Sequence, residues 1–280
     1  MDQAAWALAF TLLPWAERRK AAAWERITLE EPPLPEDARE VRELASRRGR
    51  LEAEAARRGA RLVLPGDPDA DRLLPLLPYP VALWVRGTLP PDRPALALVG
   101  SRQGTPAGRD RARRWARHLT QAGVAVLSGL ARGIDGAAHL GALEAGTTWG
   151  IQGSGLDHPY PPEHRGLMDR MAATGGGVLT PFPPEAPPRP WHFPRRNVLL
   201  AAWTRGVLVL EGRYASGSLV TARLALDLGR ELWACPGPPE APLYEGPNRL
   251  IREGAARACL GPQDIIEDLS IPVNDLTNHP

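Results

Sequence analysis

Four short segments rich in glycine and hydroxyl residues each follow an apolar run, and segments of this kind can bind anions. Glycine lets backbone amides approach a phosphate closely because it has no Cβ. One such segment predicts only a tight turn, whereas four at one sheet edge predict a phosphate-binding crevice. In chain order the segments contain Gly100, Ser101 and Arg102; Ser128, Gly129 and Arg132; Gly153 and Gly155; and Glu211, followed by Ser216, Gly217 and Ser218.

The first segment carries an arginine where a dinucleotide-binding fingerprint has glycine. Because the Gly-x-Gly-x-x-Gly spacing is missing, we do not expect NAD or FAD to bind there. The Arg102 guanidinium is instead a bidentate donor suited to phosphate. Arg109, Arg113 and Arg117 follow at helical spacing, and they form either a solvated helix face or a track for a polyanion.

A second group of cations is interleaved with aromatic residues just before an apolar helix. In chain order the group consists of Arg189, Trp191, His192, Phe193, Arg195, Arg196 and Asn197. Aromatic rings beside arginines are typical of single-stranded nucleic-acid binding, in which each stacked base contributes roughly 1–3 kcal/mol. The alternative is an interface loop in which the tryptophan and the phenylalanine are buried.

Residues arranged for catalysis are few. Asp135 and His139 lie one helical turn apart and could form an acid–base pair, although a capping or packing role is favoured. The six histidines lack the spacing of metal ligands, and the two cysteines, Cys235 and Cys259, are too few for a disulfide framework or a cysteine-based zinc site. We therefore expect no catalytic residue, no cofactor and no metal.

The composition of the chain excludes further classes of function. The 280 residues are 43% hydrophobic with a net charge of +2, which is enough apolar material for a large core. Lys20 is the only lysine, so a Walker-type phosphate loop or a Schiff base is excluded from the main domain. No apolar run reaches the ~18 residues that span a bilayer, and the first residues lack the features of a secretory signal. We expect a cytoplasmic protein.

The chain that must position these residues is predicted to divide into several segments. Residues 1–60 are predicted to be helical, with Trp6, Trp15 and Trp24 as core anchors and a proline-rich break at Glu31–Pro35 that divides them into two pieces. Residues 61–94 carry eight prolines and are predicted to be an irregular connector that packs on the core. Residues 270–280 are predicted to be a disordered tail.

Residues 95–269 alternate short apolar strands with amphipathic helices. Continuous apolar strands separated by helices predict an α/β fold, a doubly wound and mostly parallel sheet with helices on both faces. The predicted strands are Ala95–Val99, Val124–Leu127, Thr148–Gln152, Val178–Thr180, Val207–Leu210 and Leu232–Cys235. Ligands bind at the carboxyl ends of such strands, where the glycine-rich segments lie.

Several spaced motifs of the chain resemble those of the DNA processing protein A (DprA/Smf) family. They are Val99–Arg102, Ser128–Asp135 with His139, Gly155–Asp157 with Tyr160-Pro161, Phe193–Asn197, Ser216–Ser218 with Thr221–Arg223, Pro236-Gly237, and Gly246–Asn248 before Leu250-Ile251. The resemblance covers about residues 70–269 in order. It implies an extended Rossmann-like core, preceded in many members by a small helical SAM-like domain.

The resemblance also implies a function. Members are cytoplasmic, dimeric factors of natural transformation that bind and protect incoming single-stranded DNA and help to load the RecA recombinase, with no established catalysis. It assigns Arg102, Phe193, Arg196 and Asn197 to the DNA pocket. Two departures stand out: members often have a lysine shortly before the phenylalanine, where this chain has Arg189, and the chain stops too soon for the C-terminal winged helix of many members.

Two alternatives stay open. A related nucleotide hydrolase would use Glu211 or Asp135 as its acid, although the Pro-Gly-Gly-x-Gly-Thr segment of such enzymes is replaced by Ala215–Ser218. The apolar residues near the chain end predict either a homodimer interface or a cap buried within one subunit. These residues are Leu250, Ile251, Leu260, Ile265 and Ile266.

Overall fold

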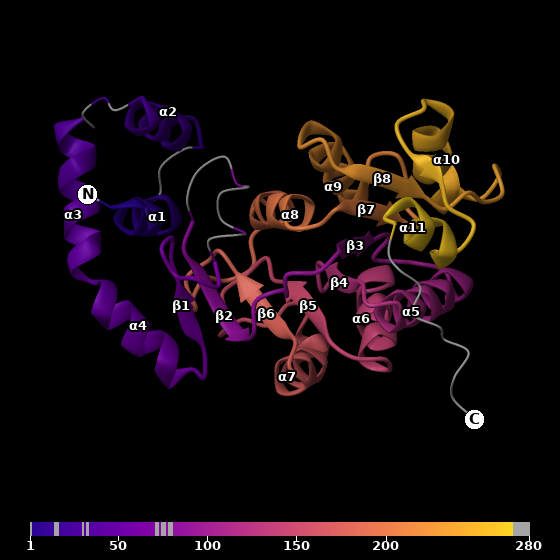
Figure 1. Ribbon diagram of the computed structural model, residues 1–280, viewed down its shortest axis with the longest axis horizontal. Helices are drawn as coiled ribbons and strands as arrows, with labels where there is room; N and C mark the ends of the chain where they lie inside the picture. The colour runs from indigo at the N-terminus through magenta and orange to yellow at the C-terminus, as the bar shows by residue number, and fades with distance from the viewer. Residues whose placement is uncertain are drawn as a thin grey trace.

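A nine-stranded sheet runs through the centre of the computed structural model, in the order β1-β2-β6-β5-β4-β3-β7-β8-β9 (Figure 1). The structure describes residues 2–13, 17–29, 31, 34–70, 73, 77 and 81–270. Strands β3 to β9 are mutually parallel, β2 pairs antiparallel with β6, and β1 pairs antiparallel with β2 at the edge of the sheet. The predicted α/β class with a mostly parallel sheet is confirmed.

The central strands are short and apolar because both of their faces are covered. All five residues of β3 are buried, and the predicted strand positions agree with the structure to within about two residues. The parallel strands are β3 (Ala95–Val99), β4 (Ala125–Ser128), β5 (Thr148–Ile151), β6 (Gly177–Thr180), β7 (Gly206–Val209), β8 (Glu231–Ala234) and β9 (Arg257–Ala258).

Helices cover the sheet on both faces (Figure 1). One core cluster joins α8 (His192–Ala202), α9 (Gly217–Asp227) and α10 (Glu245–Arg252) to one face. A second joins α5 (Pro106–Gln121), α6 (Ile134–Leu143) and α11 (Pro262–Asp268) to the other. Helix α7 (Arg165–Ala173) packs on β6 and β2. Two short 3₁₀ helices are Pro162–His164 and Pro242–Tyr244.

The prediction that residues 61–94 form an irregular connector is wrong in two places. Strands β1 (Arg61–Val63) and β2 (Leu83–Gly87) lie within it and extend the sheet, with β2 paired to β6. Residues such as Val63 and Leu83 are fully buried there. The prolines between the strands concealed this pairing, because β2 meets a partner almost a hundred residues away and no local pattern reports such a contact.

The described part of residues 1–60 contains four helices, where two helical pieces were predicted. They are α1 (Gln3–Leu12), α2 (Glu17–Thr28), α3 (Pro35–Ser46) and α4 (Arg48–Arg57). Trp6 is buried beside Phe10, and Trp24 meets the Phe10 ring edge-on at 6.3 Å, so both described anchors pack as predicted. Trp15 and the predicted disordered tail lie outside the described residues, apart from Ser270.

The strand order reverses at β3. Strands β4, β5 and β6 follow on one side of β3, and β7 returns to its other side. In open parallel sheets a crevice opens at such a reversal, between the loops that leave the two neighbouring strands. Among the residues that the structure describes, no helix is long and apolar enough to cross a bilayer.

Candidate nucleic-acid interface

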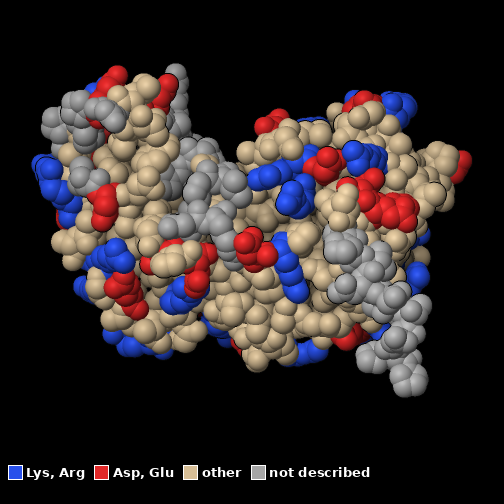
Figure 2. Space-filling model, in the orientation of Figure 1, with Lys and Arg blue, Asp and Glu red and all other residues tan. Residues whose placement is uncertain are grey.

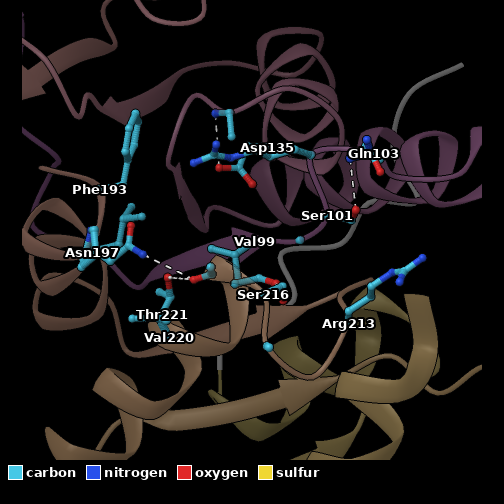
Figure 3. Close-up of a pocket in the computed structure, with 18 of the residues that line it drawn as sticks. Val99, Ser101, Gln103, Asp135, Phe193, Asn197, Arg213, Ser216, Val220 and Thr221 are labelled. Carbon is cyan, nitrogen blue, oxygen red and sulfur yellow. Dashed lines mark hydrogen bonds between the residues drawn. The ribbon is translucent and has the colours of Figure 1, made fainter. Parts of the chain in front are cut away.

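A pocket of about 620 Å³ lies at the carboxyl ends of β3 and β7, where the strand order reverses. Its walls come from the loop after β3, the first turns of α8 and the segment from β7 into α9 (Figure 3). The charged and polar residues that line it are Ser101, Arg102, Gln103, Asp135, Arg196, Asn197, Arg213, Ser216, Ser218 and Thr221.

The loop after β3 presents Arg102 to solvent at the mouth of the pocket. The Arg102 guanidinium lies 5.0 Å from the centre of the Phe193 ring. It forms no ion pair with any carboxylate that the structure describes. Gly133, with φ of +76°, allows this loop to pack closely, because a Cβ there would lie 2.3 Å from the Ser101 carbonyl oxygen. Arg102 is thus an available cation beside an aromatic ring.

Phe193 stands in the first turn of α8 and is half-buried. Its ring rests on Gly153, where an added Cβ would come within 2.7 Å of Cδ1, and Tyr160 flanks it at 5.5 Å with the planes tilted by 54°. The ring is therefore held in place from below and from the side. This arrangement fixes a stacking surface without placing the whole ring in the core.

Arg196 lies under the pocket next to Asp135, and both side chains are buried. Burial lowers the pKa of Arg196 to about 10, and the nearby Asp135 carboxylate partly offsets that effect. Burial likewise raises the pKa of Asp135. Among the described residues, the Nε and Nη1 atoms of Arg196 have no hydrogen-bond partner, and both atoms are buried, so the pocket has unpaired cationic donors beneath its lining.

The N-terminus of α9 forms the opposite wall. The Oγ atoms of Ser216 and Ser218 are 2.8 Å apart, and Asn197 Nδ2 donates to the Gly217 carbonyl at 3.5 Å. Neither serine side chain caps the helix, and the first amides of a helix have no intrahelical acceptor. The N-terminus of this eleven-residue helix, with two serine hydroxyls beside it and cations opposite, suits a phosphate.

The comparison with protein families agrees with this geometry. The model described as DNA recombination-mediator protein A matches residues 63–270. The chain belongs to the DNA recombination-mediator protein A family. Protein Smf of Escherichia coli is 41% identical over 211 residues, which are 75% of this chain and 56% of that protein. DNA processing protein DprA of Bacillus subtilis is 38% identical over 193 residues, 68% of this chain and 64% of that protein.

Two solved structures of the same family are similar. The Streptococcus pneumoniae DNA processing protein A has a TM-score of 0.76 at 28% identity and covers 96% of this chain and 99% of its own. The Helicobacter pylori protein, described for its single-stranded DNA binding mode, has a TM-score of 0.65 at 26% identity, with coverage of 72% and 94%. The chain spans less than two thirds of the length of the Escherichia coli and Bacillus subtilis relatives.

In this family member, the structure brings together most of the predicted DNA-binding residues. The pocket holds residues from the first and last glycine-rich segments and from the aromatic cluster, although these lie up to 118 positions apart. They are Gly100, Ser101, Arg102, Phe193, Arg196, Asn197, Ser216, Gly217 and Ser218. A small adjoining cavity adds Gly129 and Arg132, and the Arg132 side chain is ion-paired to Glu163.

Other predicted contacts lie away from the pocket surface. Ser128 is fully buried and donates to the Leu98 carbonyl, while Gly155 packs against the Pro183 and Pro184 carbonyls. Gly153 is buried beneath Phe193. These three residues shape the site from behind, because their neighbours leave no room for a ligand.

The flanking arginines of the aromatic cluster do not line the pocket, and their predicted contact with DNA stays a prediction. Arg189 stacks on Trp191 at 5.3 Å and Arg195 lies 5.8 Å from the Phe182 ring, so both point away from the pocket lining. On α5, Arg109 donates to the Gly104 carbonyl and Arg113 is ion-paired to Glu144. Two members of the predicted polyanion stripe therefore have internal partners.

The carboxylates considered as catalytic acids are tied to the backbone. Asp135 Oδ2 accepts from the Gly129 and Ala131 amides at 3.1 and 3.4 Å. Glu211 is fully buried and accepts from the Thr105 amide at 2.8 Å and the Thr105 hydroxyl at 2.6 Å. His139 lies 2.9 Å from the Thr148 hydroxyl through Nδ1. Asp135 and His139 have the packing roles that the spacing favoured.

The sequence analysis did not assign Arg213, Thr221 or Tyr160 to the site, although Thr221 and Tyr160 belong to the motifs that carry the family resemblance. Arg213 and Thr221 line the pocket, and Tyr160 supports Phe193. Arg213 follows the Glu211-Gly212 segment directly, so its position after a strand was the available signal. The motif that contains Tyr160 did not show its contact with Phe193, because the two residues are far apart in sequence.

The predicted dimer surface needs correction. Leu250, Ile265 and Ile266 belong to the cores of the same chain, where Ile265 and Ile266 are 0% and 1% exposed. Their apolar surface is already covered because α11 packs against α5 and α10 against β8. Ile251 is half-buried, and Leu260 is 78% exposed. Of the five residues, Leu260 alone presents a largely open side chain.

Proposed function

We propose that the chain binds single-stranded DNA in the pocket at the carboxyl ends of β3 and β7. The observation that carries this proposal is the half-buried Phe193 ring in a pocket that two cations line, the exposed Arg102 and the buried Arg196. A base stacks against Phe193, and the neighbouring phosphate lies toward the arginines and the α9 N-terminus. The described binding mode of the Helicobacter pylori relative supports the same ligand.

The wider role follows from the family. The match to a recombination mediator supports a protein that protects incoming single strands during natural transformation and helps to load RecA in the cytoplasm. We also propose a homodimer, for which Leu260 and Ile251 offer the remaining apolar surface among the predicted contacts. A nucleotide hydrolase is less well supported, because Asp135 and Glu211 are buried and bound to backbone amides.

Fluorescence anisotropy with a labelled single strand of about twenty nucleotides tests the proposal, alongside a nucleotide-hydrolysis assay on the same preparation. Saturable binding that weakens with salt is expected, since phosphate contacts release counterions. Absence of strand binding, or steady release of product from a nucleoside monophosphate, would overturn it.

A further inference from the structure

A cluster of arginines around Tyr214 lies beside the pocket and shares Arg213 with the pocket lining. Tyr214 is half-buried in the loop between β7 and α9, between two lining residues, Arg213 and Ala215. The Arg249 guanidinium of α10 lies 3.7 Å from the centre of its ring, and that of Arg223 on α9 lies 5.6 Å away. We call Arg213, Tyr214, Arg223 and Arg249 the Tyr214 cluster.

The cluster is held rigidly. Glu253 accepts from Arg249 Nε at 2.6 Å, which helps to hold the guanidinium over the ring. The Glu245 carboxylate lies 3.5 Å from the Tyr214 amide and ties the loop to α10. A guanidinium fixed over an aromatic ring presents its other face to solvent as a planar cation, on which a nucleobase can stack.

Charge and position favour a polyanion as the ligand. The three arginines outweigh the two carboxylates, Glu245 and Glu253, and Arg223 and Arg213 are exposed without an ion pair to a described carboxylate. Figure 3 places Arg213 across the pocket from Phe193, with its side chain directed away from that ring. Figure 2 shows arginine atoms over the α8–α9 side of the molecule.

We infer that the Tyr214 cluster is a second stacking and phosphate-binding platform for single-stranded DNA that leaves the pocket on the side opposite Phe193. The inference rests on the proposed function, because the strand must first occupy the pocket. The pocket then binds one part of the strand at Phe193, and the cluster binds nucleotides farther along it. The affinity of the chain consequently increases with strand length beyond what the pocket alone can hold.

The test compares oligothymidylates of about four and about twelve nucleotides on the same protein. With the wild-type chain the longer strand binds more tightly. Tyr214→Ala and Arg223→Gln each weaken binding of the longer strand about fivefold or more, and leave the shorter strand within about twofold. Tyr214→Phe, which keeps the ring, restores the wild-type length dependence.

Arg205→Gln is the matched control. Arg205 is an exposed arginine just before β7, so it lies at the amino end of that strand, whereas the pocket lies at the carboxyl end. Thermal melting checks that Tyr214→Ala is folded, and exposed Arg223 tests the cluster with little effect on packing. Equal weakening of both strands would show that the cluster only supports the pocket, and no weakening would show that it does not touch DNA. Either result overturns the inference while the proposed function stands. If the wild-type chain binds neither strand, the proposed function fails as well.

Discussion

Arg102 combines exposure, charge and a ring contact in one side chain. Because it forms no ion pair with a described carboxylate and lies 5.0 Å from the Phe193 ring, it is free to meet a phosphate next to a stacked base. Arg102→Ala should weaken single-strand binding by about 1–3 kcal/mol and reduce the salt dependence by about one counterion. Anisotropy titrations at several salt concentrations measure both, with Arg205→Gln as the control. Unchanged affinity and slope in a folded variant would contradict the assignment.

Phe193 and Phe182 provide a matched pair of aromatic residues. Phe193 is half-buried, whereas Phe182 is 4% exposed and stacks on His192 with 3.9 Å between the ring centres. Phe193→Ala should abolish stacking and weaken DNA binding, with a smaller loss of unfolding free energy than the roughly 3–5 kcal/mol typical of a buried phenylalanine. Phe182→Ala should show that larger loss. Melting and binding measurements on both variants separate the roles, and an equal drop in stability would assign Phe193 to the core.

At the scale of elements, the packing of α6 on the sheet depends on a neutral histidine. His139 is fully buried, its Nε2 has no partner, and burial lowers its pKa to about 3. The unfolded chain takes up a proton near its ordinary pKa of about 6.5, whereas the folded chain does not until about pH 3. Stability is therefore complete above pH 6.5 and is lost as the pH falls below it.

The size of this effect sets a test. Stability should fall by up to about 1.4 kcal/mol per pH unit from His139 alone between pH 6.5 and 5, above the range of most carboxylates. In His139→Asn this part of the pH dependence should disappear, even if the variant is less stable overall. Denaturant unfolding at several pH values measures the slope, and exposed His158→Asn is the control. An identical slope in wild type and His139→Asn would show that His139 does not titrate differently on folding.

At the scale of the whole molecule, the shape of the pocket favours single strands. Stacking on Phe193 requires an unpaired base, and extruding one from a duplex costs a few kcal/mol. Arg109 and Arg113 have internal partners, and exposed arginines such as Arg117 offer duplex phosphates only a non-specific, salt-sensitive attraction. Preference for single strands should therefore widen as salt rises from about 50 to 200 mM. Competition titrations at both concentrations test this, and equal affinities at the higher salt would identify a general polyanion binder.

The proposed homodimer also belongs to this scale. Light scattering at micromolar concentration should give twice the mass of one chain. Leu260→Asp should shift the mass toward one chain, since it places a charge on the most exposed of the predicted contacts. Leu140→Asp, at a 40% exposed leucine on α6, is the control. A wild-type mass of one chain would exclude the dimer under these conditions.

Local sequence was sufficient to predict the repeating units of the fold and the chemistry of the site. Apolar runs such as Ala95–Val99, the glycine-rich segments behind them and the ring and cations around Phe193 depend on neighbouring residues, so their patterns are visible in the chain itself. These patterns indicated the sheet, its ligand-binding edge and most of the pocket.

The tertiary structure alone decided which of these segments meet. The reversal of strand order at β3 joins the loops after β3 and β7, and it leaves Gly153 and Gly155 behind the pocket wall. The tertiary structure also pairs β2 with β6, and it buries Ile265 and Ile266 within one chain. Each outcome depends on contacts between residues far apart in sequence, whose pairing is set by burial and hydrogen bonding across the whole sheet rather than by any local pattern.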